Sequence, residues 1–182
     1  MTDAQTTEVS AGGLLAPLAT SPHQRVAGLI ALVGGVLMIA ASFVDWAEYP
    51  DGPHDDARVG LSPLGGTLPE GTSYGSATPG VWTAVFGALV ALGGVAILVR
   101  RGVGVAGLIA GLAGVAGFVV ACTFLIDPVG AFGLAAPTLP VDQYFPYSGA
   151  ALWVLFGASL FGSVAGAQAV VLALRRDRPN PF

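Results

Sequence analysis

Residues 103–126 read VGVAGLIAGLAGVAGFVVACTFLI, an unbroken stretch without a single charged side chain. As an α-helix with a rise of about 1.5 Å per residue, this stretch would be about 36 Å long, which exceeds the roughly 30 Å thickness of a bilayer's hydrocarbon core. A surface helix of a soluble domain carries charged or polar residues every few positions, and this stretch does not. It therefore predicts a transmembrane helix.

Three further uncharged, apolar runs occupy residues 26–44, 81–99 and 150–174. The shorter ones would reach about 28 Å as helices, close to the thickness of the hydrocarbon core. The composition agrees, since only 10% of the residues are charged and the mean hydropathy is +0.75, whereas soluble domains have about 25% charged residues. We expect an all-α membrane protein, a bundle of four transmembrane helices with two extracytoplasmic loops.

The apolar runs divide the chain into nine segments. These are a flexible N-terminal tail (1–24), four transmembrane helices (25–45, 81–99, 103–126 and 150–174), two outer loops (46–80 and 127–149), a tight turn (100–102) and a C-terminal tail (175–182). Prolines recur through both outer loops and exclude long helices there. The first loop also allows a short hairpin over residues 59–68, with Gly65 and Gly66 as its turn.

The arginines are distributed unevenly between the two sides of the predicted membrane. Six of the seven lie before the first helix, between the second and third, or after the fourth: Arg25, Arg100, Arg101, Arg175, Arg176 and Arg178. Only Arg58 lies in an outer loop. Because cytoplasmic segments are enriched in arginine, this distribution predicts that both termini are cytoplasmic and both long loops extracytoplasmic. We therefore expect a multi-pass protein of the plasma membrane.

Aromatic residues gather near the predicted outer ends of the helices. Trp46 and Tyr49 follow the first helix, and Trp82 and Trp153 lie near the starts of the second and fourth. Since Trp and Tyr are enriched where hydrocarbon meets water, we expect these four side chains to form an interfacial belt. The second outer loop adds three aromatic residues that we expect at the membrane surface: Tyr144, Phe145 and Tyr147.

Small residues recur at spacings of three and four in the third and fourth helices. They are Gly104, Gly107, Gly111 and Gly114 in the third helix, and Ser159, Gly162, Ser163 and Gly166 in the fourth. Such spacings place small residues on one face of a helix, where they allow another backbone to approach closely. Two interpretations stay open: the faces pack inside the bundle, or they bind another membrane subunit.

A faint internal repeat relates the two halves of the chain. Residues 82–88, WTAVFGA, resemble residues 153–158, WVLFGA, and each of these helices ends in an Arg-Arg pair. Apolar sequence of low complexity produces such similarities by chance as well. Duplication of a helical hairpin is therefore one of two open explanations.

No pattern of catalytic residues or cofactor ligands is present in the sequence. The apolar runs contain no charged residue, whereas proton relays and ion paths need ionisable groups within the membrane. The best metal candidate is DGPHDD in the first loop, where Asp51, Asp55 and Asp56 offer carboxylate oxygens. This segment lacks the regular ligand spacing of a calcium-binding loop, so we favour a solvated acidic turn. We expect no catalytic residue, no cofactor and no bound metal.

Three segments give the chain a resemblance to a known group of proteins. They are SFVDW at 42–46, VGLSPLGG at 59–66, and GVWTAVFG at 80–87, the last in a helix that ends at Arg100 and Arg101. On these segments the chain resembles a broad group of uncharacterised, small four-span membrane proteins of actinobacteria. Members often have proline where this chain has Asp45. The resemblance implies an actinobacterial plasma membrane and brings no activity with it.

These observations predict a non-enzymatic structural or accessory subunit that packs against other membrane subunits, or copies of itself, through small-residue helix faces. Membrane lipid is the other expected partner, and no nucleic acid is expected. The alternative is a small lipid-handling or carrier protein with an apolar groove between helices. An enzyme comes third, because the outer loops offer only carboxylates and one histidine without a recognisable arrangement.

Overall fold

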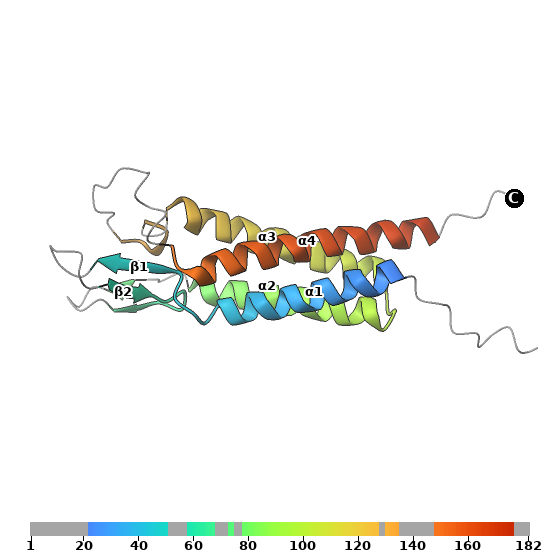
Figure 1. Ribbon diagram of the computed structural model, residues 1–182, viewed down its shortest axis with the longest axis horizontal. Coiled ribbons are helices and arrows are strands. Elements are labelled where there is room, and N and C mark those ends of the chain that lie inside the picture. The colour runs from blue at the N-terminus through green and yellow to red at the C-terminus, as the bar shows by residue number, and fades with distance from the viewer. Residues whose placement is uncertain are drawn as a thin grey trace, which may run out of the picture.

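The computed structural model describes residues 22–50, 58–67, 73–74, 78–127, 130–134 and 148–176. Its four long helices are α1 (Pro22–Ala41), α2 (Pro79–Leu98), α3 (Val103–Ile126) and α4 (Ala150–Arg176). They form one elongated bundle (Figure 1). Each helix is long and apolar enough to cross a membrane. The prediction of a bundle of four helices, each long and apolar enough to span a membrane, is confirmed.

Two helices begin earlier than predicted, and each begins at a proline. The first residue of α1 is Pro22, and that of α2 is Pro79. Proline suits the first turn of a helix because its φ angle is already helical and the first amides have no partner within the helix. At the other end of the chain, α4 continues to Arg176, two residues past the predicted boundary at residue 174.

The earlier start of α1 places Gln24 inside the bundle and not in a tail. Its side chain is only 1% exposed, and its Nε2 donates a hydrogen bond of 3.0 Å to the carbonyl oxygen of Ile97 in α2. The last carbonyls of a helix have no partner within that helix. Gln24 therefore gives one of these carbonyls a donor from another helix and ties the end of α2 to the first turn of α1.

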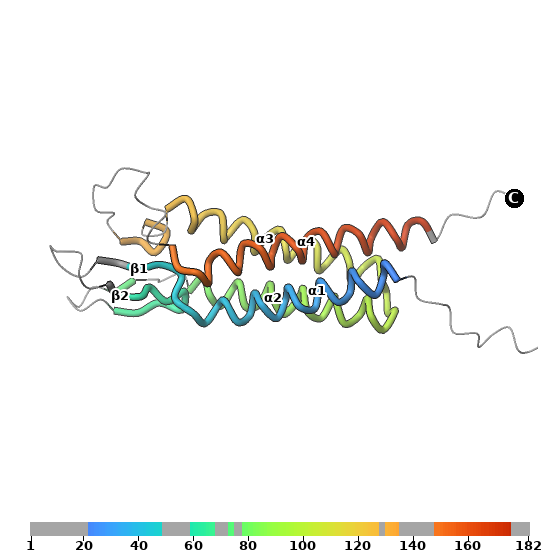
Figure 2. Tube along the Cα trace, in the orientation of Figure 1, coloured from blue at the N-terminus to red at the C-terminus, as the bar shows by residue number. Residues whose placement is uncertain are grey.

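Consecutive helices are antiparallel neighbours around the bundle. α1 packs against α2 and α4, and α3 also packs against α2 and α4. Contacts across the diagonal between α2 and α4 are few. Figure 2 shows the resulting arrangement as a tube, with the turn between α2 and α3 at the end where α1 begins and α4 ends.

Two glycines on α1 meet two glycines on α2, with a spacing of seven residues on each helix. A side chain at Gly35 would lie 2.5 Å from the carbonyl oxygen of Gly87, and a side chain at Gly94 would lie 2.8 Å from the carbonyl oxygen of Gly28. The two backbones are thus in contact at both levels. In lipid, where no hydrophobic force drives helices together, this close packing is what holds α1 against α2.

Short strands and one 3-10 turn cover one end of the bundle. Two antiparallel pairs form, β1 (Ala47–Pro50) with β2 (Arg58–Leu61) and β3 (Gly66–Thr67) with β4 (Ser73–Tyr74). The 3-10 turn η2 (Gly130–Phe132) follows α3. We call β1 to β4 and η2 the cap. The hairpin predicted over residues 59–68 is wrong, because β2 pairs with β1 and β3 pairs with β4.

Backbone hydrogen bonds join the cap to the starts of α2 and α4. The amide of Gly149 donates to the carbonyl oxygen of Trp46 at 2.7 Å, and the amide of Gly80 donates to that of Pro63 at 2.8 Å. Ala47 also forms an antiparallel bridge with Ser148. Because an amide buried away from water needs a partner, these bonds fix how the chain enters both helices.

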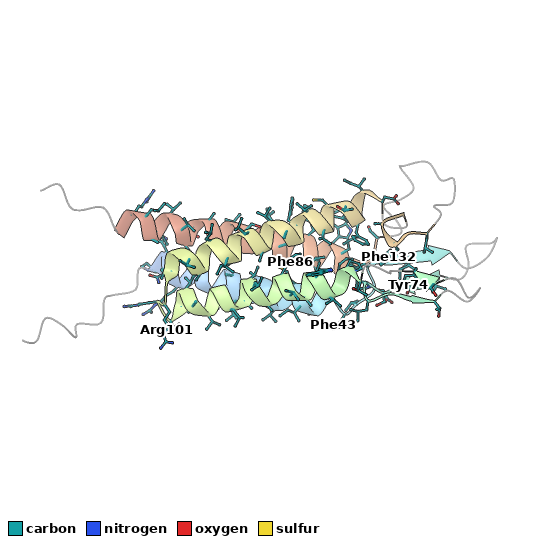
Figure 3. All side chains as sticks on the ribbon, turned by 180° about the vertical axis from the view of Figure 1, so that it is seen from behind. Phe43, Tyr74, Phe86, Arg101 and Phe132 are labelled. Carbon is teal, nitrogen blue, oxygen red and sulfur yellow. The ribbon has the colours of Figure 1, made fainter. Side chains whose placement is uncertain are left out.

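Trp46, the residue before β1, packs between the cap and the helices. Its side chain is fully buried, and its Nε1 donates a hydrogen bond of 2.7 Å to the carbonyl oxygen of Ala41 at the end of α1. Its ring meets that of Phe124 edge to face, and Phe124 meets Phe132 in the same way, with centroids 5.1 and 4.9 Å apart. Phe132 and Tyr74 continue this row of aromatic rings (Figure 3).

The predicted belt of interfacial aromatics is therefore wrong for Trp46, which anchors the cap and is hidden from lipid. Trp82 and Trp153 do face outward, with 59% and 46% of their surfaces exposed. The side chain of Tyr49 lies outside the described residues, and so do three other aromatic residues of the prediction, Tyr144, Phe145 and Tyr147.

Residues 99–102 reverse the chain between α2 and α3 by using the left-handed backbone region twice. Arg100 has φ +60° and Gly102 has φ +56°. The amide of Arg101 donates to the carbonyl oxygen of Ala96 at 2.9 Å, and the amide of Arg100 to that of Ile97 at 3.3 Å. This pair of bonds is a Schellman motif, in which glycine usually occupies the position of Arg100.

Replacing Arg100 by glycine is expected to stabilise the bundle by about 1 kcal/mol, because a Cβ atom is strained in the left-handed region. The midpoint of an SDS titration, followed by tryptophan fluorescence, would measure the gain. The matched control is Gly102→Ala, since a Cβ there meets nothing within 4 Å and should cost about 1 kcal/mol from the backbone alone. If Gly102→Ala were the stabilising change, this account of the turn would be wrong.

Candidate functional site

Six of the small residues singled out in the sequence meet where α3 packs against α4: Gly107, Gly111, Gly114, Ser159, Ser163 and Gly166. A side chain at Gly107 would lie 2.8 Å from the carbonyl oxygen of Gly166, and one at Gly114 would lie 2.6 Å from the amide nitrogen of Ser163. A side chain at Gly166 would collide with the backbone of Gly111. The structure thus places these residues on a contact within the chain.

The remaining two small residues of the prediction lie at different contacts. A side chain at Gly104 would meet the Cβ of Ala173 at 3.3 Å, which lets α3 begin close to α4. A side chain at Gly162 would lie 2.9 Å from Cγ1 of Val90 on α2. Gly162 therefore serves the diagonal approach of α2 and α4, away from the seam between α3 and α4.

We call the contact of α1 with α2 the seam α1/α2, and that of α3 with α4 the seam α3/α4. Both seams place small residues seven positions apart on each helix. Gly28 and Gly35 on α1 are seven residues apart, and so are Gly107 and Gly114 on α3. Their contacts on the partner helices, Gly94 with Gly87 and Gly166 with Ser159, have the same spacing. The small-residue pattern of the sequence had pointed to Gly87 but not to Gly28, Gly35 and Gly94, although the shared spacing of seven was a signal that could have found them.

This arrangement also corrects the alignment suggested by the internal repeat. The similar segments WTAVFGA and WVLFGA align Gly87 with Gly157. Gly87, however, is pressed against α1, whereas a side chain at Gly157 would meet nothing within 4 Å. By its contacts, Gly87 corresponds to Ser159. The two halves therefore share a packing pattern that is offset from the visible sequence similarity.

An apolar groove of about 550 Å³ lies between α1 and α4 on the outside of the bundle. We call it the α1/α4 groove. Its floor includes Gly157 and Ala158, and its walls include Leu29 and Phe161, which are 55% and 61% exposed. Trp153 borders it at the end nearer the cap. The groove is open at Gly157 because nothing on α1 fills that position.

A smaller hollow of about 360 Å³ lies where the cap meets the start of α4. Its lining includes the residues Asp45 and Glu48, and it reaches Gly149 at the beginning of the helix. Within the part of the chain that the structure describes, no group of three or more metal-binding side chains comes together. The weak metal candidate formed by Asp51, Asp55 and Asp56 lies outside that part.

The predicted topology residues that the structure describes lie at one end of the bundle, which we call the arginine end. They are Arg25 in α1, Arg100 and Arg101 in the turn, and Arg175 near the end of α4. Figure 3 shows Arg101 at the end opposite Tyr74 and Phe132. The backbone of Arg176 ends α4, and Arg178 lies outside the described residues. The described acidic residues, Asp45, Glu48 and Asp127, lie at the cap end.

The described residues offer a partner two features, an apolar groove and charged ends of the bundle. The α1/α4 groove offers apolar walls and a small-residue floor, and the two ends of the bundle carry opposite charge. No protein-family model, characterised protein or solved structure gives a significant match to the chain. Its function has to be argued from this geometry.

Proposed function

We propose that the chain is a non-enzymatic accessory subunit that holds a transmembrane helix of a partner protein in the α1/α4 groove. The observation that carries the proposal is the open position at Gly157. At the glycines of the seams α1/α2 and α3/α4, a Cβ atom would meet the backbone of a neighbouring helix of the same chain. At Gly157 it would meet nothing within 4 Å. It is the place where a further backbone can approach.

The physical reason is the way helices associate in lipid. Lipid tails are as apolar as leucine, so a helix gains little from apolar contact alone and must gain from close packing. The α1/α4 groove provides a hollow of about 550 Å³, into which the side-chain ridge of another helix can pack. Small residues at its floor, Gly34, Gly157 and Ala158, allow a short distance between helix axes.

We also propose the orientation of this subunit and its membrane. Four described arginines at one end and three acidic residues at the other fit the rule that cytoplasmic segments are rich in arginine. Both termini are then cytoplasmic and the cap faces the outside. The resemblance to four-span proteins of actinobacteria supports a plasma membrane. A reporter fused to each terminus would test this arrangement, and a reporter that is active outside the cell at either terminus would contradict it.

A photo-crosslinking experiment tests the proposed docking in the native membrane. A crosslinking amino acid replaces Val154, which lines the α1/α4 groove, or Leu92, which is 65% exposed on α2 and serves as the control. We expect a protein adduct from position 154 and not from position 92. The substitution Gly157→Leu, at a position where a Cβ atom would meet nothing within 4 Å, adds a side chain to the floor of the groove. It should abolish that adduct and reduce the mass seen in native electrophoresis to that of the monomer.

Lipid handling is a second candidate, favoured by the fact that the groove is apolar and opens sideways to lipid. The same experiment separates the two. A lipid adduct at position 154, together with monomeric migration of the unmodified protein in mild detergent, would replace the accessory function by lipid handling. Equal protein adducts from positions 154 and 92 would contradict both.

A further inference from the structure

A second apolar groove, of about 350 Å³, runs along the outside of the bundle between α3 and α4. We call it the α3/α4 groove. Its lining includes Gly111 and Leu112 of α3, and Ala167 and Val171 of α4. Leu112 and Val171 are 63% and 46% exposed. A side chain at Gly111 would come no closer than 3.7 Å to α4, so the two helices leave room here that they do not leave at Gly107.

The groove leads to an arginine. Ser163, Ala167 and Val171 all line it and follow one another at intervals of four residues, so they lie on one stripe of α4. The next residue on that stripe is Arg175, which is exposed. Ala173 faces Gly104, in the first turn of α3. At about 1.5 Å per residue, Arg175 lies roughly 3 Å beyond that level, where α3 has just begun.

Among the residues that the structure describes, the charge at the end of the bundle where Arg175 lies is of one sign. The described charged residues at this end of the bundle are Arg25, Arg100, Arg101 and Arg175, and the described carboxylates belong to the opposite end. A guanidinium group binds a phosphate through two parallel hydrogen bonds. Basic residues beside transmembrane helices also attract anionic lipid. An apolar groove that ends at such a group matches a molecule with an apolar chain and an anionic head.

We propose that the α3/α4 groove holds an acyl chain of an anionic phospholipid whose headgroup pairs with Arg175. The lipid belongs to the leaflet at the arginine end of the bundle. The proposal concerns a different surface from the proposed helix docking and does not depend on it.

Lipid binding to the purified full-length protein would test the assignment. Native mass spectrometry measures how much phosphatidylglycerol, and how much zwitterionic phosphatidylcholine, the protein retains. We expect a preference for phosphatidylglycerol that Arg175→Gln weakens about fivefold, the effect of removing one basic residue near an anionic headgroup. Arg101→Gln is the matched control, because it removes the same charge from the same end but lies in the turn before α3.

A second variant tests the groove itself. Ala167 is exposed and lines the α3/α4 groove, so Ala167→Phe should fill it and weaken retention of phosphatidylglycerol while the thermal stability of the protein stays unchanged. Three results would overturn the proposal: equal weakening by Arg175→Gln and Arg101→Gln, no preference between the two lipids, or full retention of phosphatidylglycerol by Ala167→Phe. The first would indicate attraction to the whole arginine end, without a site.

Discussion

Replacing Gly166 by leucine is expected to drive α4 away from α3 and to abolish the folded bundle. A side chain at this position would collide with the backbone amide of Gly111 and would lie 2.6 Å from the carbonyl oxygen of Gly107. Both obstacles are backbone atoms, so no change of rotamer can make room. Overpacking a well-packed core costs about 1 to 3 kcal/mol. Because a whole helix has to move here, we expect a loss of more than about 3 kcal/mol.

The matched control is Gly157→Leu, the same substitution in the same helix. A Cβ atom at Gly157 would meet nothing within 4 Å, and the position opens into the α1/α4 groove. This variant should therefore unfold at the same SDS concentration as the unmodified protein. The two variants add the same volume and the same hydrophobicity to α4. If both variants unfolded at the SDS midpoint of the unmodified protein, the close backbone contact between Gly166 and α3 would be contradicted.

The helices could be predicted because a bilayer requires each spanning helix to be apolar over the thickness of the hydrocarbon core. A run of about 20 apolar residues satisfies it whatever lies beside it, and residues 103–126 were predicted to their ends. The start of α1 was misplaced because Pro22 and Gln24 are not apolar, although a proline begins a helix well. A hydropathy pattern has no way to show that Gln24 hydrogen bonds to the end of α2.

The glycine contacts were harder to predict. A glycine stripe indicates that some backbone comes close, but not which one. The contact of Gly107 with Gly166 and that of Gly35 with Gly87 depend on how α3 and α1 are rotated about their axes. The position at Gly157 is open because no side chain of α1 reaches it. The α1/α4 groove is lined by residues of two helices. The sequence pattern of either helix alone therefore does not predict it.

The burial of Trp46 could not be predicted from its sequence position either. Trp46 and Trp82 both lie next to the predicted outer ends of helices, and composition treats them alike. The structure buries the first completely and leaves 59% of the second exposed. The difference arises because residues after α1 fold back as β1 and β2 over the end of the bundle, a course that the hydropathy of the loop does not specify.

Replacing Trp46 by alanine is expected to detach the cap from the bundle and to cost about 3 to 5 kcal/mol, the range for removing a large aromatic side chain from a core. The variant loses the edge-to-face contact with Phe124 and the hydrogen bond to the carbonyl oxygen of Ala41. The cavity would lie beneath the cap, so Phe132 and Tyr74, which continue the row of rings, would lose their support.

Trp82→Ala is the matched control, because it removes an exposed tryptophan near the same end of the bundle and should change stability by less than about 0.5 kcal/mol. The SDS midpoints measure both variants, and protease sensitivity at β1 and β2 separates loss of the cap from loss of the bundle. Trp46→Phe restores most of the ring but not the donor to Ala41, so it should fall between the two. A Trp46→Ala protein as stable and as protease-resistant as Trp82→Ala would mean that the cap is held without the Trp46 side chain.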